Sequence, residues 1–385
     1  CYVEFVFDQE VGTWIRCHRQ AFEWFGGIPK RVVIDNLKAA IVKAAIYDPI
    51  VQRAYRECAE HYGFLISPCR PRTPEHKGRV EQVGFDQDTL RDAANRLPFG
   101  LVGHLLDECV VASSCPHFGL LLGVQSGPAA AGIAGHLFRH AESVHAALRM
   151  FIAHLHLHDR GGVVTLSPQG AEDVELSYVI HHPNTPGTAQ ILDASIAIAC
   201  SVMRSLCGAQ WTPSAVLLSR DRPGMVAPYR SFFRAPIRFD APRSALVFPA
   251  RYLGQPVAGA DPAARTRLLA LAAELDAARP ASVTELTIRA LTRMVIATSP
   301  TSDKVAEVLG IKSRRLRERL EVEGSSVKGL LEDLRCELAR QLLEDSRMSI
   351  ADIAATLHYS KPGAFSRAFR CWTGQTPRQW RTAVG

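Results

Sequence analysis

One helical pattern occurs twice near the end of this 385-residue chain, as SDKVAEVLGIKSRRLRERLEVEG (302–324) and SIADIAATLHYSKPGAFSRAFRCWTG (349–374). Each copy predicts a short helix with apolar periodicity, a tight turn, and a second helix with exposed basic residues. In the first copy Gly310 permits the turn, and Leu316 and Leu320, four positions apart, anchor the second helix. This pattern is typical of helix-turn-helix DNA-binding units. Two units joined by a helix at 326–345 predict an all-α DNA-binding domain.

Positive charge is concentrated in the first copy. The net charge of the whole chain is only +7. Five basic residues nevertheless lie within eight positions, interrupted by the acid Glu318: Lys312, Arg314, Arg315, Arg317 and Arg319. Such a run alone is compatible with a solvated helix face. On the second helix of a helix-turn-helix unit, it favours contact with double-stranded DNA.

Length and composition limit the remaining alternatives. A chain of 385 residues is expected to form two to four domains. Its ten cysteines include no C-x-x-C pair, which favours reduced thiols over a zinc site or a disulfide framework. The most apolar helix, 189–206, contains Asp193 and Arg204, and the ten uncharged residues between them are too few to cross a bilayer. With no signal peptide pattern, we expect a cytoplasmic protein without a membrane partner.

The first 82 residues alternate between strand and helix, which indicates a sheet flanked by helices. Strands are expected at 2–7, 31–36 and 64–69, helices at Thr13–Trp24 and Asp48–Tyr62, and a loop entering a helix at 70–82. We assign 1–82 as a partial α/β fragment. Because the chain begins at Cys1 rather than Met, a longer protein upstream remains open.

This fragment resembles the integrase catalytic core of IstA-type insertion-sequence transposases, through FEWFGGIPKRVVIDNLKAAI (22–41) and ISPCRPRTPEHKGRVE (66–81). The resemblance implies an RNase H-like fold and an Asp-Asp-Glu triad that holds two divalent metal ions. It places the second aspartate at Asp35 and the glutamate at Glu81. The first aspartate would precede Cys1, since Asp8 is too close to Asp35. We therefore expect a vestigial site with no metal and no cofactor. Mg²⁺ and DNA strand transfer remain the alternative if the missing aspartate lies upstream.

A different pattern begins near residue 84 and predicts an α+β domain at 84–260. Helices are expected within 85–123 and at Ser143–His158, Ala189–Cys207 and Tyr229–Arg234, a hairpin at 163–168 and 174–182, and further strands at 214–220, 235–240 and 244–253. The segment 211–262, which begins WTPSAVLLSRDRP, is similar to the effector domain of AraC-type regulators related to the ornithine-utilisation group. The resemblance implies an unknown small-molecule effector and identifies no effector-binding residue.

The histidines of this domain do not predict a metal site. His154 and His158 share a helix face, but His156 points away, and no Cys or carboxylate at a suitable spacing completes the ligand set. No nucleophile, base and oxyanion hole can be assembled either, so we do not expect an enzyme.

Two helices precede the repeated pattern. The first helix, Pro262–Ala278, lies within a linker at 261–281. It is either a linker or homodimer seam, or a helix that packs against its own domain. Ser282–Thr298 is expected to open the DNA-binding domain, 282–385.

The second copy, through FSRAFRCWTGQTPRQWR (365–381), resembles the AraC/XylS DNA-binding domain. In that family each second helix enters the major groove, one turn of DNA apart. The resemblance places a DNA-facing set at Arg314, Arg315, Arg317, Glu318, Lys361, Gly363, Ser366 and Arg367. Arginine can pair with guanine and glutamate can accept from cytosine. Arg367 and Arg370 are better placed to clamp phosphates.

Two departures from that family lie in the turns. Lys312 stands where a capping serine is usual, so Ser313 is expected to cap one position later. His358 replaces the usual turn glycine, and it is expected to adopt a left-handed conformation with modest strain. The sequence therefore predicts an effector-responsive transcriptional regulator behind an integrase-like fragment.

Overall fold

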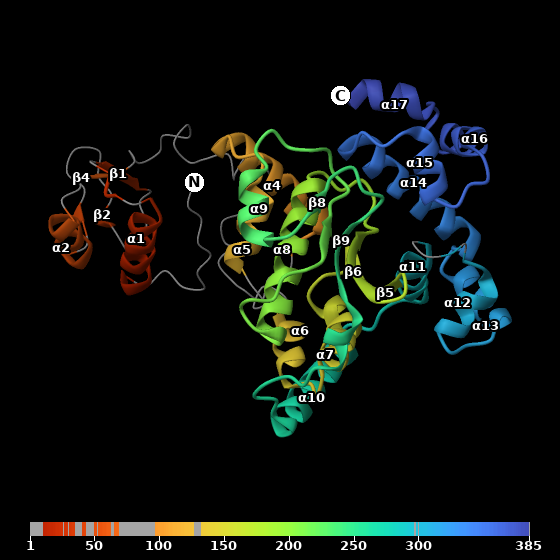
Figure 1. Cartoon of the computed structure of the whole chain (residues 1–385), viewed down its shortest axis with the longest axis horizontal. Coiled ribbons are helices and arrows are strands. Elements are labelled where there is room, and N and C mark those ends of the chain that lie inside the picture. Colours follow the sequence, from red (N-terminus) through yellow and green to blue (C-terminus); the bar gives the residue numbers. More distant parts are fainter. Residues whose placement is uncertain are drawn as a thin grey trace. The chain divides into compact units, whose positions relative to one another are not determined.

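The computed structural model describes residues 11–25, 27–29, 31–34, 41–43, 50–51, 53–62, 65–68, 97–126, 132–295, 298 and 300–384. The chain forms two compact units, Cys1–Glu108 and Cys109–Gly385, whose elements are labelled in Figure 1. Asp35 and Glu81 lie outside the described residues, as does the strand expected at 2–7.

The first unit contains the parallel strand pair that the alternating pattern predicts. Its elements are α1 (Val11–Phe25), β1 (Arg31–Ile34), β2 (Ile41–Lys43), β3 (Ile50–Val51), α2 (Arg53–Tyr62) and β4 (Leu65–Pro68), followed by the start of α4 (Phe99–Ser113). Strands β1 and β4 run parallel, with Arg31 opposite Leu65. Phe22 of α1 and Tyr55 of α2 are buried in one small core.

Helix α2 begins five residues later than expected. The sequence pattern predicted a helix from Asp48, but Ile50–Val51 pairs antiparallel with Ile41–Lys43. That pairing requires extended backbone, so the helix starts only at Arg53.

The second unit contains a five-stranded sheet in the order β5-β6-β9-β7-β8, with β7 and β8 parallel and the other pairs antiparallel. Its strands are β5 (Gly162–Gln169), β6 (Asp173–Ile180), β7 (Ala215–Leu217), β8 (Ile237–Arg238) and β9 (Ser244–Pro249). The helices up to the linker are α5 (Phe118–Ser126), α6 (Gly132–Leu137), η4 (Phe138–His140), α7 (Val144–His154), η5 (Leu155–Leu157), α8 (Thr188–Cys207), α9 (Ala227–Phe233), η6 (Ala250–Gly254) and α10 (Pro262–Ala278). The predicted hairpin is therefore confirmed.

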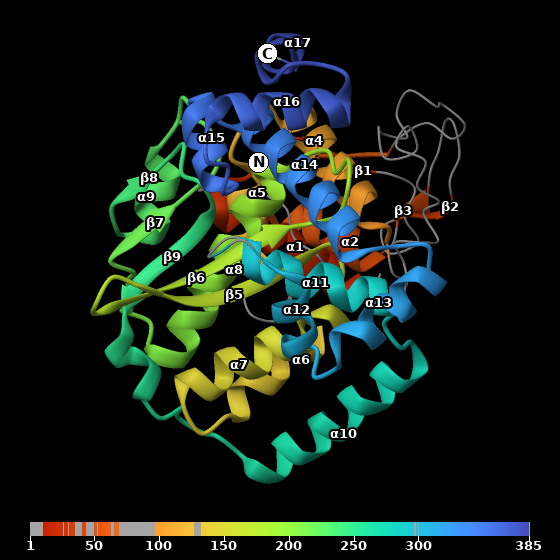
Figure 2. The same cartoon turned by 90° about the vertical axis from the view of Figure 1, so that its right-hand side faces the viewer.

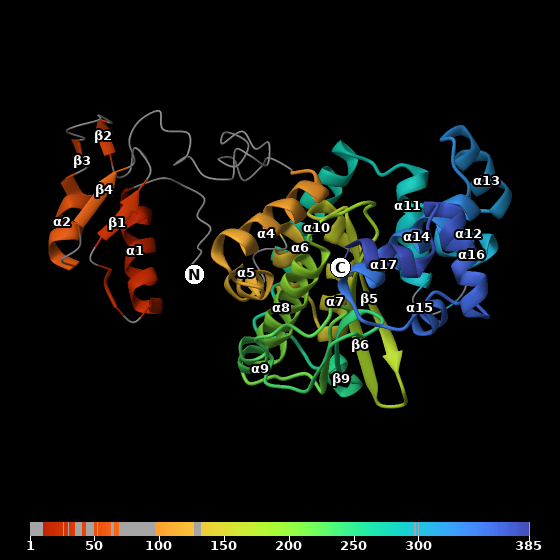
Figure 3. The same cartoon turned by 90° about the horizontal axis from the view of Figure 1, so that it is seen from above.

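Strand β6 is buried from Val174 to Ile180 on both of its faces. In Figures 1 and 3, α8 lies on one side of the sheet and α11 (Val283–Val295) and α14 (Val327–Asp345) lie on the other. The buried positions of β6 include the polar residues Glu175 and Ser177 as well as apolar ones.

Helices α5 and α8 cross at very short distance because glycines line the contact. A Cβ atom on Gly119 would lie 2.1 Å from the carbonyl oxygen of Gln190, and one on Gly123 would lie 2.3 Å from that of Ala194. The amide of Gly119 donates to Gln190 Oε1 at 2.8 Å. Tight packing explains the apolar character of α8.

Helix α8 has the length and composition of a membrane span when its two charged residues are counted. However, 61% of the residues in its most apolar stretch are buried within the protein, as in the core helix of a globular fold.

The C-terminal part of the second unit is all helical. Its helices are α11, α12 (Ser302–Val308), α13 (Ser313–Val322), α14, α15 (Ile350–Thr356), α16 (Pro362–Thr373) and α17 (Pro377–Val384). Figure 2 shows α12–α13 and α15–α16 on different parts of α14. Leu334 of α14 lies in the core of the first pair, and Leu342 and Leu343 lie in the core of the second. One helix therefore supports both helix-turn-helix units.

Candidate nucleic-acid interface

The turns of the two units have the same backbone geometry. Gly310 and His358 are both left-handed, with φ of 66° and 61°. The amide of Ile311 donates to the carbonyl of Ala306 at 3.0 Å, and that of Tyr359 donates to the carbonyl of Ala354 at 2.9 Å. These six-residue loops are Schellman motifs, which usually need glycine. The left-handed conformation expected for His358 is confirmed.

Each second helix buries one apolar face and exposes the opposite one. Helix α13 buries Leu316 and Leu320, and α16 buries Phe365 and Phe369. The exposed members of the predicted set are Arg314, Arg315, Arg317, Glu318, Lys361, Gly363, Arg367 and Arg370. Ser366 is half-buried. The structure therefore brings the predicted residues onto the two helices that a DNA-binding domain would present.

Arg314 and Glu318 form an ion pair on the exposed face of α13. Arg314 Nε lies 2.8 Å from Glu318 Oε1, and the two side chains are 90% and 57% exposed. Pairs of this spacing on a helix surface contribute only about 0.3–0.5 kcal/mol. The pair therefore adds little to the stability of α13.

Ser313 does not cap α13. The helix begins at Ser313 with Lys312 at the N-cap position and no side-chain cap. The Ser313 hydroxyl donates instead to Asp303 Oδ1 at 2.5 Å. The extended backbone of Lys312 starts the helix at Ser313, so this serine stands one position too late to cap, and its hydrogen bond to Asp303 links α13 to α12.

Two further residues share the outer faces. Val322 is 88% exposed and lies four positions after Glu318, and exposed Cys371 lies four positions after Arg367. Helical periodicity places each pair on one face. This spacing is visible in the sequence, but neither residue is charged, so the basic pattern did not include them.

Helix α14 is attached to the sheet domain by hydrogen bonds near its C-terminal half. Glu337 Oε2 accepts from the amide of Asn184 at 3.0 Å, and Gln341 Nε2 donates to the carbonyl of Ile180 at 3.3 Å. The Thr188 hydroxyl donates to Asp345 Oδ2 at 2.5 Å. The helix that carries both DNA-binding units is therefore fixed to the preceding domain.

The sheet domain has a buried polar centre around Asp193. Arg220 Nη1 lies 2.7 Å from Asp193 Oδ2, and the Tyr229 hydroxyl donates to the same oxygen at 2.5 Å. Burial raises the pKa of Asp193, and the Arg220 guanidinium partly offsets that shift. His156 pairs with Asp276 at 2.6 Å. Within the described ranges, no three His, Cys, Asp or Glu side chains gather as metal ligands.

The N-terminal segment is similar to part of known transposases. A putative transposase of Mycobacterium tuberculosis is 43% identical over 81 residues, which are 21% of this chain and 20% of that protein. The chain thus spans about a fifth of that relative.

The rest of the chain is similar to transcriptional regulators. The family described as "Arabinose-binding domain of AraC transcription regulator, N-term" matches residues 79–257, and the family described as "Helix-turn-helix domain" matches residues 305–383. The HTH-type transcriptional regulator VirS of Mycobacterium tuberculosis is 26% identical over 73% of this chain and 83% of its own length. The ornithine utilization regulator of Pseudomonas aeruginosa is 26% identical over 79% of this chain and 93% of its own length. From residue 79 to residue 383, the chain belongs to the AraC family of transcriptional regulators with a helix-turn-helix DNA-binding domain.

Proposed function

We propose that this regulator reads a bipartite DNA site with α13 and α16 and that a small-molecule effector controls the reading. The observation that carries the proposal is the equivalence of the two turns at Gly310 and His358, each followed by a helix with an exposed basic face. Two equivalent units on one supporting helix suit two successive major-groove segments.

The proposed contacts differ between the helices. On α13, Arg314, Arg315 and Arg317 face guanines or phosphates, and Glu318 accepts from cytosine. Val322 is suited to the methyl group of thymine. On α16, Lys361, Gly363 and Ser366 lie nearest the DNA, while Arg367 and Arg370 clamp phosphates.

Effector control would act through α14. Its contacts with Asn184, Ile180 and Thr188 fix the DNA-binding units to the sheet domain. An effector changes DNA affinity only if it binds two arrangements of these parts with different affinity. We propose that such an effector strengthens or weakens the contacts between α14 and the sheet domain.

A homodimer is proposed through α10. Ala272 of this helix packs in one core with Leu137 and Leu157 of its own domain. Leu269, Leu271 and Leu275 of the same helix are nevertheless 38–45% exposed. Leu271→Glu with Leu275→Glu should convert a dimer to a monomer in sedimentation equilibrium, whereas the exposed control Glu274→Lys should not. If the wild-type protein sediments as a monomer, the proposed homodimer interface on α10 is wrong.

For the N-terminal unit, we propose an RNase H-like integrase fragment with a vestigial site. The parallel pair β1–β4 and the transposase similarity support it. The competing function is DNA strand transfer with Asp35, Glu81 and Mg²⁺. The reading frame upstream of Cys1 separates the two, because only an aspartate at a strand end there completes the triad. We further propose a cytoplasmic regulator that needs no cofactor.

The experiment for the regulatory function is selection of DNA sequences from a random pool with the full chain. The expected result is one enriched motif with two separated halves. Enrichment of no motif would contradict the proposal.

A further inference from the structure

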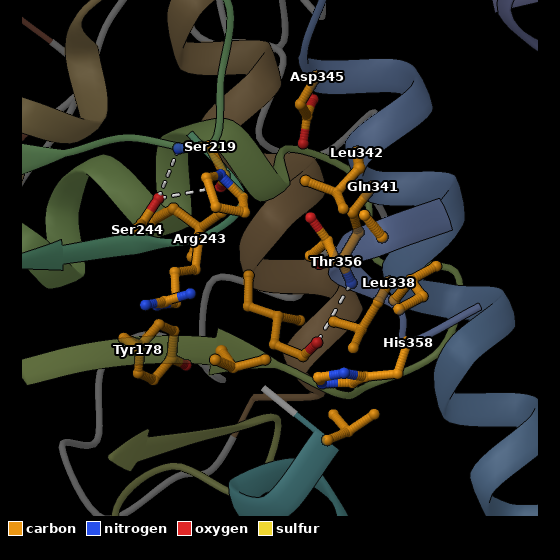
Figure 4. Close-up of a pocket in the computed structure, with 17 residues that line it drawn as sticks. Tyr178, Ser219, Arg243, Ser244, Leu338, Gln341, Leu342, Asp345, Thr356 and His358 are labelled. Atoms are coloured by element: carbon orange, nitrogen blue, oxygen red, sulfur yellow. Dashed lines mark hydrogen bonds between the residues drawn. The ribbon is translucent and has the colours of Figure 1, made fainter. Parts of the chain in front are cut away.

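A cavity of about 250 Å³ lies between the sheet domain and the second helix-turn-helix unit. Figure 4 shows both walls. One wall comes from the ends of β6 and β9 and from α8, and the other from α14 and α15. In Figure 4, Thr356 and His358 reach across from one wall toward Arg243 and Tyr178 on the other.

The cavity is mostly apolar and is not part of the DNA-facing surface. Aliphatic and aromatic side chains supply most of its lining, namely Tyr178, Val179, Ile180, Leu192, Pro242, Val295, Leu338, Leu342, Ala355 and Leu357. Ligand pockets in proteins combine such a lining with a few convergent polar groups. Here Gln341, Thr356 and His358 supply the polar groups from the DNA-binding side.

The charged groups of the lining already have partners within the protein. Arg243 donates to the buried carboxylate of Glu175 through Nε and Nη2. The distance from Nη2 to Glu175 Oε2 is 2.8 Å. Asp345 accepts the Thr188 hydroxyl at 2.5 Å. An ion brought into this mostly apolar cavity would lose its hydration, and an anion would find the Arg243 charge already neutralised by Glu175, which is costly. The lining therefore favours an uncharged ligand.

We propose that this cavity is the effector site and that it takes an uncharged, largely apolar small molecule with one or two hydrogen-bonding groups. The proposal deepens the regulatory function proposed above and rests on it for its biological meaning. Both walls are complete only when α14 and α15 are docked on the sheet domain. By linkage, a ligand that needs both walls stabilises the docked arrangement.

The site also borders the turn of the second unit. Thr356 ends α15, and His358 holds the left-handed position before α16. An occupant that contacts these two residues touches the turn that orients the second recognition helix. This contact gives the ligand a direct physical connection to the DNA-reading element.

The test uses tryptophol as an uncharged probe, with indole-3-acetate and tryptamine as anionic and cationic analogues of the same aromatic body. Binding to the full-length chain is measured by isothermal titration calorimetry. Tryptophol should bind saturably, and both charged analogues should bind at least about tenfold more weakly, equivalent to about 1.4 kcal/mol. Absence of saturable tryptophol binding, or tighter binding of either ion, would overturn the proposal.

Two cavity-filling variants locate the binding. Thr356→Phe and Ala355→Phe should each weaken tryptophol binding at least about tenfold. Ala351→Phe, on an exposed position of the same helix, should not. Ala355 is itself exposed, so at least its substitution is expected to fold, and thermal unfolding checks this. Unchanged affinity in a folded Ala355→Phe variant would refute the location.

Hydrogen exchange then tests the coupling without DNA. Tryptophol should slow amide exchange in the C-terminal half of α14 and in α15, and it should leave α13 unchanged. Equal slowing in α13 or no slowing in α14 would contradict the docking role. These measurements need no DNA, so they test the ligand site alone. The regulatory function is tested separately, by the selection of DNA sequences.

Discussion

Gly310 and His358 occupy equivalent turns of the two helix-turn-helix units with nearly equal left-handed φ, 66° and 61°. A residue with a Cβ pays about 1–2 kcal/mol for this conformation, and glycine does not. The fold therefore holds a small strain in the second unit that is absent from the first.

Substituting the turn residues should reveal that strain. His358→Gly is expected to raise the free energy of unfolding by ~0.5–1 kcal/mol, after the entropic cost of glycine is subtracted. Gly310→Ala should lower it by ~1 kcal/mol, although no atom lies within 4 Å of the added Cβ. Urea denaturation of both variants measures this. Destabilisation by His358→Gly would mean that the imidazole makes a compensating contact.

The two recognition helices should respond differently to loss of an arginine. Arg314→Ala is expected to change the preferred base at one position of the motif, at a cost of about 1–3 kcal/mol on the original site. Arg367→Ala should weaken binding to all sequences and reduce the salt slope by about one. Competition binding at several salt concentrations separates these effects. Uniform loss from both changes would contradict the assigned roles.

The buried centre of the sheet domain should depend on its cation. Asp193 is 1% exposed, and Arg220→Ala leaves its carboxylate without that counterion. The expected loss of stability is about 3–5 kcal/mol. Arg230→Ala, at an exposed position of α9, is the control and should cost less than about 0.5 kcal/mol. Thermal and urea unfolding measure both. Equal stability of the two variants would show that Arg220 contributes no compensation.

Acid should destabilise the second unit through His181. Burial, with the neighbouring charges of His182 and Arg289, lowers the pKa of His181 to about 4. Below pH of about 6.5 the unfolded chain binds a proton that the folded chain does not, so stability falls as the pH drops from about 6.5 toward 4, by up to about 3 kcal/mol. His181→Gln should flatten this dependence in urea titrations at several pH values. If the unfolding free energy of the variant depends on pH as in the wild type, other groups cause the acid destabilisation.

Local patterns were enough to predict the second helices of both helix-turn-helix units. The spacing of Leu316 with Leu320 and of Phe365 with Phe369 is visible in the sequence, and the structure buries these residues. The expectation that Ser313 caps α13 was wrong because Lys312 takes the N-cap position with extended backbone, and the partner of the Ser313 hydroxyl is Asp303 on another helix. The start of α2 was missed because it depends on a strand pairing rather than on local propensity.

The cavity and the docking of α14 could not be predicted either. Glu337 meets Asn184 across 153 positions, and Asp345 meets Thr188 across 157. The apolar periodicity of a single helix or strand carries no information about partners so far away in the sequence. These contacts are set by how the domains pack, which only the folded structure shows.

In the proposed complex, α13 and α16 of a single chain enter two successive major-groove segments. The most direct measurement is methylation interference on the selected DNA motif with full-length protein. We expect two groups of guanines whose methylation blocks binding, on one face of the duplex and about 10 base pairs apart, and Arg314→Ala should remove the interference at one position of the α13 group. A single group of interfering guanines, or an interference pattern that Arg314→Ala leaves unchanged, would contradict this placement.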